Sequence, residues 1–78
     1  MLNKTFFEIF RRYEAQGERR KLLERATGVD VRYCRAPFRV EVDMVFPAVE
    51  DHVLLYAIED ELRTLYEARS FRIFPKYP

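Results

Sequence analysis

Two stretches of alternating apolar and polar residues constrain the fold of this chain more than any other feature. The first covers residues 29–35, and its apolar side chains are Val29, Val31 and Tyr33. The second covers residues 38–46, and its apolar side chains are Phe38, Val40, Val42, Met44 and Phe46. Successive side chains of a strand point to opposite faces of a sheet. The two stretches therefore predict an antiparallel hairpin with one buried and one wet face, connected near Pro37.

The remaining segments predict three helices and one further strand. Residues 3–17 have apolar residues at helical spacing, a capping box made by Thr5 and Glu8, and Gly17 as a C-terminal cap. Residues 18–26 predict a short second helix with a basic outer side. Residues 48–68 predict a long helix of about five turns, with acidic residues in its first turn. Residues 69–74 return to the alternation of a strand.

The order of these elements, α-α-β-β-α-β, predicts the fold class. A hairpin followed by a crossover helix and another strand gives a three-stranded mixed sheet, whose last strand runs parallel to a hairpin strand. The helices must cover one face because the other face is charged. We therefore expect a single α+β domain over residues 1–78, built as a two-layer sandwich with a KH-like arrangement.

Composition excludes several classes of function. The formal net charge is +1, which argues against a strongly basic nucleic-acid binder. Basic residues dominate both ends of the chain, whereas acidic residues dominate 48–68. The single cysteine excludes an intramolecular disulfide, and no long apolar run predicts a membrane span. The apolar start is interrupted by charges and lacks a signal-peptide cleavage site, so we expect a cytoplasmic protein without a membrane partner.

The residues offer little for catalysis or metal binding. Cys34 and His52 are the only cysteine and histidine, and they fall on different predicted elements. Neighbouring acidic residues on a helix point in different directions, so Glu59, Asp60 and Glu61 do not converge on a metal ion. The two glycines form no phosphate-binding loop. We predict no catalytic residue, metal site, cofactor or small-molecule substrate in this segment.

Two surfaces are candidates for contact with a partner protein. The first is the side of the long helix that carries four charged residues: Glu59, Asp60, Arg63 and Glu67. The second is a set of aromatic residues without an obvious place in the core: Phe7, Phe74 and Tyr77. Each has an alternative interpretation, because charged helix faces are commonly just solvated surface, and sequence beyond this chain could cover the aromatic side chains.

A second function class is single-strand nucleic-acid binding through the second helix. KH modules clamp the backbone with a GXXG loop between two helices. Here Gly17-Glu18-Arg19-Arg20 occupies such a place, but it lacks the second glycine and carries an acidic residue. The cations available for phosphate contact are Arg19, Arg20, Lys21 and Arg25. A KH-like shape without its loop favours a protein-binding derivative.

From Val29 onwards the chain resembles the N-terminal domain of PolC-type DNA polymerase III alpha subunits, the replicases of low-GC Gram-positive bacteria. The resemblance covers about two thirds of the chain and lies in the pattern of these features: Val31–Tyr33, Phe38–Phe46, Pro47, Leu54–Tyr66 and Arg72–Tyr77. The ending "FRIFPKYP" is similar to the strand exit of clostridial members. At the hairpin turn this chain has "RAPF", where many members have a Lys/Ser-rich turn followed by Trp.

The resemblance implies that the chain is cut from a much longer polymerase, a nucleotidyltransferase that acts in DNA replication. The parent would continue through an OB-fold domain, a PHP domain, an exonuclease and the polymerase, and its catalytic carboxylates lie outside this segment. The family's N-terminal domain is similar to a KH-like domain of the clamp-loader tau subunit. The expected role is a tether between polymerase and tau, with DNA contacted only through the parent.

Overall fold

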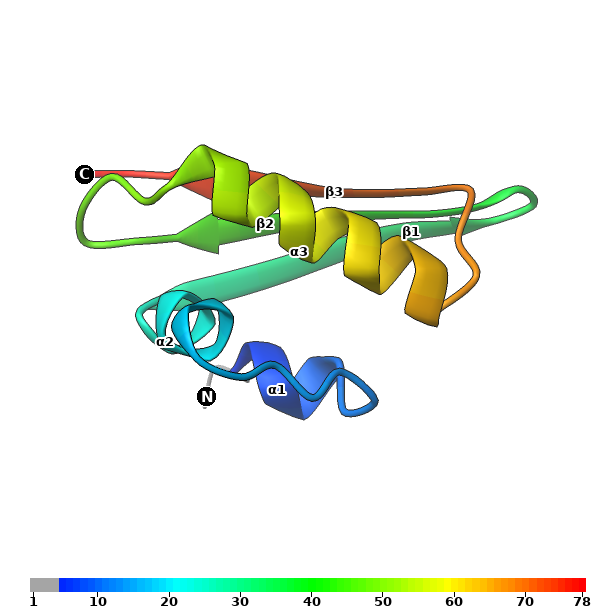
Figure 1. Ribbon diagram of the computed structural model, residues 1–78. Coiled ribbons are helices and arrows are strands. Elements are labelled where there is room, and N and C mark those ends of the chain that lie inside the picture. The colour runs from blue at the N-terminus through cyan, green and yellow to red at the C-terminus, as the bar shows by residue number, and fades with distance from the viewer. Residues whose placement is uncertain (1–4) are drawn as a thin grey trace.

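A computed structural model describes residues 5–78 and confirms the predicted order of elements (Figure 1). The strands are β1 (Gly28–Arg35), β2 (Phe38–Val45) and β3 (Ser70–Lys76), and the helices are α1 (Phe6–Ile9), α2 (Glu18–Glu24) and α3 (His52–Leu65). The sheet has the order β1-β2-β3, with β1 antiparallel and β3 parallel to β2. The described residues thus form an α+β fold around a mixed three-stranded sheet.

The register of the strands gathers the apolar side chains on one face. Val31 pairs with Val42, which in turn pairs with Ile73, so the three side chains leave the sheet on the same side. Val42 and Ile73 are buried beneath the helices, whereas the neighbouring Glu41 and Arg72 are exposed on the open face. This alternation confirms that the helices cover one face of the sheet.

The first helix is much shorter than the sequence predicts. The capping box is present, since the Thr5 side chain accepts from the Glu8 N–H and the Glu8 carboxylate accepts from the Thr5 N–H. The helix nevertheless ends at Ile9, and residues 3 and 4 of the predicted range lie outside the described residues. Residues 10–17 are irregular but still bury Tyr13 and Ala15. Tertiary contacts therefore override the helical preference of this segment.

The long helix also starts later than predicted. Glu50 and Asp51 were expected in its first turn, but the helix begins at His52. Asp51 is the N-cap, because its carboxylate accepts from the N–H groups of Val53 and Leu54. The cap satisfies backbone donors that a helix start leaves without partners. The second helix and the last strand lie where the sequence predicts them.

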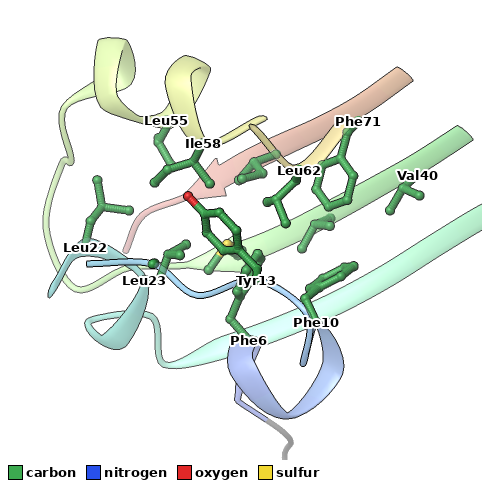
Figure 2. Close-up of a cluster of buried hydrophobic side chains, with 14 of the residues drawn as sticks. Phe6, Phe10, Tyr13, Leu22, Leu23, Val40, Leu55, Ile58, Leu62 and Phe71 are labelled. Carbon is green, nitrogen blue, oxygen red and sulfur yellow. The ribbon is translucent and has the colours of Figure 1, made fainter. Parts of the chain in front are cut away.

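The core lies between the helices and the inner face of the sheet. Seven large side chains are almost fully buried: Phe6, Leu22, Val42, Met44, Phe46, Ile58 and Leu62. Figure 2 shows side chains of α2 and α3 converging with Phe6, Phe10 and Tyr13 from the N-terminal segment. Every helix thus contributes to one core.

One predicted core residue is not buried. Tyr33 pairs with Val40, so its side chain leaves β1 on the face that the helices cover, yet it is 61% exposed. The hairpin extends past the end of α3 (Figure 1), and α1 is too short to cover what remains. The prediction that Tyr33 belongs to the core was therefore wrong.

Candidate interaction surface

The acidic run on α3 does not form one exposed surface. Glu59, predicted on the outer side, is buried, and its Oε2 accepts a hydrogen bond of 2.6 Å from the backbone N–H of Ile73. The same oxygen lies 3.7 Å from Arg72 Nε. Strand β3 is an edge strand, and its outward N–H groups lack a strand partner. The prediction of an exposed Glu59 was wrong, because its carboxylate accepts a hydrogen bond from an edge-strand N–H and so connects α3 to β3.

Glu61 is also committed inside the domain. Its Oε1 accepts a 2.6 Å hydrogen bond from the Tyr13 hydroxyl, and its Oε2 lies 2.9 Å from Arg19 Nε. Burial and the hydrogen bond to this carboxylate raise the pKa of Tyr13 far above its usual value, so the phenol remains a donor. Glu61 therefore fastens the irregular segment 10–17 and α2 to α3. Within the run, Asp60 and Glu61 remain exposed, but only Asp60 pairs with a residue of α3 alone.

An apolar stripe occupies the outer side of α3 and the residue positions just before it. Val49, Val53 and Tyr56 follow one another at spacings of four and three, and are 79%, 66% and 60% exposed. We call these three residues the α3 stripe. The His52 and Tyr56 rings pack edge to face, with their centres 5.9 Å apart. Sequence reasoning missed the stripe, although its spacing opposite the buried leucines was a readable signal.

The α3 stripe lies between two sets of predicted site residues, the charged residues Asp60 and Arg63 and the aromatic residue Tyr77. Asp60 and Arg63 continue the same helical line beyond Tyr56, and they form an ion pair at 3.1 Å. Both belong to a shallow groove between α3 and β3 that Tyr56 also lines. At the other end, the Tyr77 hydroxyl accepts a 3.3 Å hydrogen bond from the N–H of Glu50, next to Val49. Apolar side chains thus run between a charged pair and an aromatic residue.

The other predicted site residues lie elsewhere. Phe7 is half-buried on the helical side, with the Arg20 guanidinium 4.8 Å from its ring centre. Phe74 is half-buried on the open face of the sheet, where Arg72 lies 5.5 Å from its ring centre. Glu67 follows the end of α3 with a positive φ of 52°. The aromatic residues therefore do not gather into a single patch.

Each cation proposed for nucleic-acid binding on α2 is paired with a carboxylate. The shortest pair joins Arg25 to Glu50 by two hydrogen bonds of 2.7 and 2.8 Å. These bonds lower the pKa of Glu50 below its usual range. The other pairs, at 2.9, 3.2 and 3.7 Å, are Arg19–Glu61, Arg20–Glu24 and Lys21–Glu18. A phosphate would have to compete with an internal partner at every one of these positions.

Gly17 has a different role from the predicted one. It is the N-cap of α2 and adopts a φ of 61°, which only glycine adopts without strain at its ψ of −134°. It therefore does not cap α1, which ends well before it. The Gly17-to-Arg20 segment forms the start of α2, where Arg19 already contacts Glu61.

Cys34 and His52 are not positioned to act together. Cys34 is exposed near the hairpin end, whereas His52 begins α3 near the opposite end of the sheet (Figure 1). Among residues 5–78 no group of three His, Cys, Asp or Glu side chains is arranged to hold a metal ion. The described helices are also too short or too polar to cross a membrane. Comparisons with protein-family models, curated proteins and solved structures found no match to this chain.

Proposed function

We propose that this chain is a non-catalytic protein-interaction domain of a replicative DNA polymerase, and that it tethers the polymerase to the clamp-loader tau subunit. The observation that carries the interaction role is the α3 stripe, which leaves Val49, Val53 and Tyr56 open to solvent. The resemblance to PolC-type N-terminal domains supplies the identity of parent and partner. The elements that carry this resemblance, a hairpin, a long helix and a last strand, are all present.

The chemistry of the α3 stripe suits a protein partner. Apolar anchors at helical spacing are the form in which a helix inserts into a partner's groove. Tyr56 combines a large apolar ring with a hydroxyl, and tyrosine is enriched among residues that dominate binding energy. Asp60 and Arg63 border the stripe with charges of both signs, which can fix orientation without adding much affinity.

The alternative, a KH-like domain that binds single-stranded nucleic acid, has weaker support. Its cations would be Arg19, Arg20, Lys21 and Arg25, and each of them contacts a carboxylate. Exposed pairs such as Lys21–Glu18 are weak and exchange readily for a phosphate. The signature of this function would be an affinity that falls steeply with salt.

A calorimetric titration of the 78-residue chain with the C-terminal region of tau, in moderate salt, tests the proposal. We expect saturable binding that Tyr56→Gln or Val53→Gln weakens by about tenfold or more, equivalent to roughly 1.4 kcal/mol. The matched control is Tyr33→Thr, because Tyr33 is as exposed as Tyr56 but lies at the hairpin. A parallel titration uses a single-stranded oligonucleotide. Salt-sensitive binding to the oligonucleotide, with none to tau, would contradict the tether.

A further inference from the structure

A second apolar surface lies at the hairpin end of the domain, away from the α3 stripe. It is a groove of about 370 Å³ between the N-terminal segment, the hairpin and the C-terminal end of α3. The lining residues that matter here are Ile9, Phe10, Tyr33, Phe38, Tyr66 and Phe71, and we call this the hairpin groove. Most of its surface is apolar, whereas hollows elsewhere on the described chain have a larger polar share.

The groove exists because the sheet is longer than the helix layer. Phe10 and Phe71 pack edge to face at 5.3 Å and form a buried floor. Tyr33 and Phe38 continue the same face of the sheet, but Tyr33 is mostly exposed and Phe38 is half-buried. Preformed hollows lined by apolar and aromatic side chains are typical of ligand sites, and exposed apolar patches mark interaction surfaces.

Three arginines surround the hairpin groove. The Arg12 guanidinium lies 5.3 Å from the centre of the Tyr66 ring. The backbone N–H of Arg12 donates a 3.3 Å hydrogen bond to the Tyr66 hydroxyl. Arg35 pairs with Phe38 across the hairpin, so its side chain leaves the sheet on the groove side. The backbone N–H of Arg69 donates to the backbone carbonyl of Phe38 at 2.8 Å, so the main chain of Arg69 lies next to this groove residue.

These arginines differ from the cations of α2 in one respect that matters for binding. Arg12, Arg35 and Arg69 form no ion pair with a carboxylate within residues 5–78. Glu14 and Glu67 each lie two residues from one of these arginines along the chain and likewise form no ion pair among the described residues. The rim therefore carries a net positive charge that an incoming carboxylate can reach without displacing an internal partner.

We infer that the hairpin groove binds an acidic peptide segment of a partner protein. A bulky apolar side chain of the peptide fills the groove over Phe10 and Phe71, while flanking carboxylates meet the guanidinium groups of Arg12, Arg35 and Arg69. A peptide suits the site better than a nucleic-acid strand. Strand binders align many cations along a backbone path, whereas this site has three cations around an apolar hollow. The inference is independent of the tether role assigned to the α3 stripe.

Peptide display against the immobilised 78-residue chain is the first test. Random peptides are first selected for binding to the chain. Peptides that also bind the Arg35→Glu variant are then removed, because this variant differs from the chain in the sign of one exposed rim charge. We expect the enriched peptides to combine Asp or Glu with Phe, Leu or Trp. An enriched set without acidic residues, or no enrichment over a blank surface, would overturn the inference.

The second test uses one enriched peptide, synthesised and titrated into variants that circular dichroism shows to be folded. We expect Tyr33→Thr and Arg35→Glu each to weaken binding by about tenfold. Tyr56→Gln, which removes an equally exposed tyrosine from α3, leaves binding unchanged. If the Tyr33 and Arg35 variants bind as the unaltered chain does, the groove is not the site.

Two further outcomes would replace the peptide with another occupant, and either would overturn the inference. The first is a concentration-dependent dimer in sedimentation that Tyr33→Thr abolishes, because a second copy then fills the groove. The second is oligonucleotide binding lost in Arg35→Glu but kept in Arg20→Ala. Neither outcome bears on the α3 stripe, since tau binding is measured separately and depends on Tyr56.

Discussion

Helices α2 and α3 contribute buried leucines to the same core, yet their outer sides differ. The outer side of α2 carries cations that each contact a carboxylate, and two of those pairs, Arg19–Glu61 and Arg25–Glu50, connect it to α3 or to the loop before it. The outer side of α3 carries Val53 and Tyr56, both mostly exposed. The difference indicates that the charges of α2 serve the fold, while the apolar stripe of α3 remains available to a partner.

The inner and outer sides of α3 should differ most in their contribution to stability. Leu62 is fully buried on the inner side, so Leu62→Ala should lower the free energy of unfolding by about 2–5 kcal/mol. Tyr56→Gln, on the outer side, should change it by no more than about 0.5 kcal/mol. Urea denaturation followed by circular dichroism measures both. Similar losses for the two variants would mean that the stripe is part of the fold.

The buried carboxylate on α3 should behave unlike its exposed neighbour. Glu59→Leu leaves the Ile73 N–H without an acceptor and should cost about 1–3 kcal/mol of unfolding free energy. Glu59→Gln retains an acceptor oxygen and should cost less. Asp60→Asn serves as the control, because Asp60 is exposed and, among the described residues, pairs with Arg63 alone. Equal stability of the Glu59→Leu and Asp60→Asn variants would contradict the edge-satisfying role.

The start of α2 depends on a backbone conformation rather than on side-chain contacts. The new methyl group of Gly17→Ala meets no atom within 4 Å, so its expected cost of about 1–3 kcal/mol comes from the backbone conformation, φ 61° with ψ −134°. Gly28→Ala is the matched control, because its new methyl group makes an ordinary 3.6 Å contact with Val45 and its φ is not positive. Thermal unfolding of both variants measures the difference. A tolerated Gly17→Ala would remove this account of the helix start.

The smallest expected effect is the acid dependence of the pair that connects α2 to the start of α3. Arg25 lowers the folded-state pKa of Glu50 below its ordinary value of 4.5. The pair therefore contributes stability that is fully present above about pH 4.5 and is lost as the pH falls through the lower folded value. Glu50→Gln and Arg25→Gln should both flatten the decline of stability in this range. A decline unchanged in both variants would show that the pair is not its source.

The hairpin and the order of elements were predictable because strand and helix periods are local properties of the sequence. The alternation in residues 38–46 is long enough to fix which side of β2 faces the helices. The position of each charge was not predictable in this way. Whether Glu59 faces solvent or β3 depends on how α3 lies over an edge strand, which no local pattern encodes.

The length of α1 was also not predictable from local spacing, and it leaves the hairpin end around Tyr33 exposed. The spacing of Phe6, Phe10 and Tyr13 is that of one helix face, and all three side chains are buried. The helix nevertheless ends at Ile9. Because α1 ends at Ile9, none of the described helices covers the hairpin end around Tyr33, which stays 61% exposed. The alternation that predicted Tyr33 as inward was right about its face and wrong about its burial. The resemblance to PolC-type domains remains a prediction that binding must test.

The most direct test of the account is an NMR titration of the ¹⁵N-labelled 78-residue chain with the C-terminal region of tau. We expect saturable shift changes centred on Val49, Val53 and Tyr56, and little change along α2. Shift changes centred on Arg19 to Arg25, or a spectrum that tau leaves unaltered, would contradict the assignment of α3 as the partner surface.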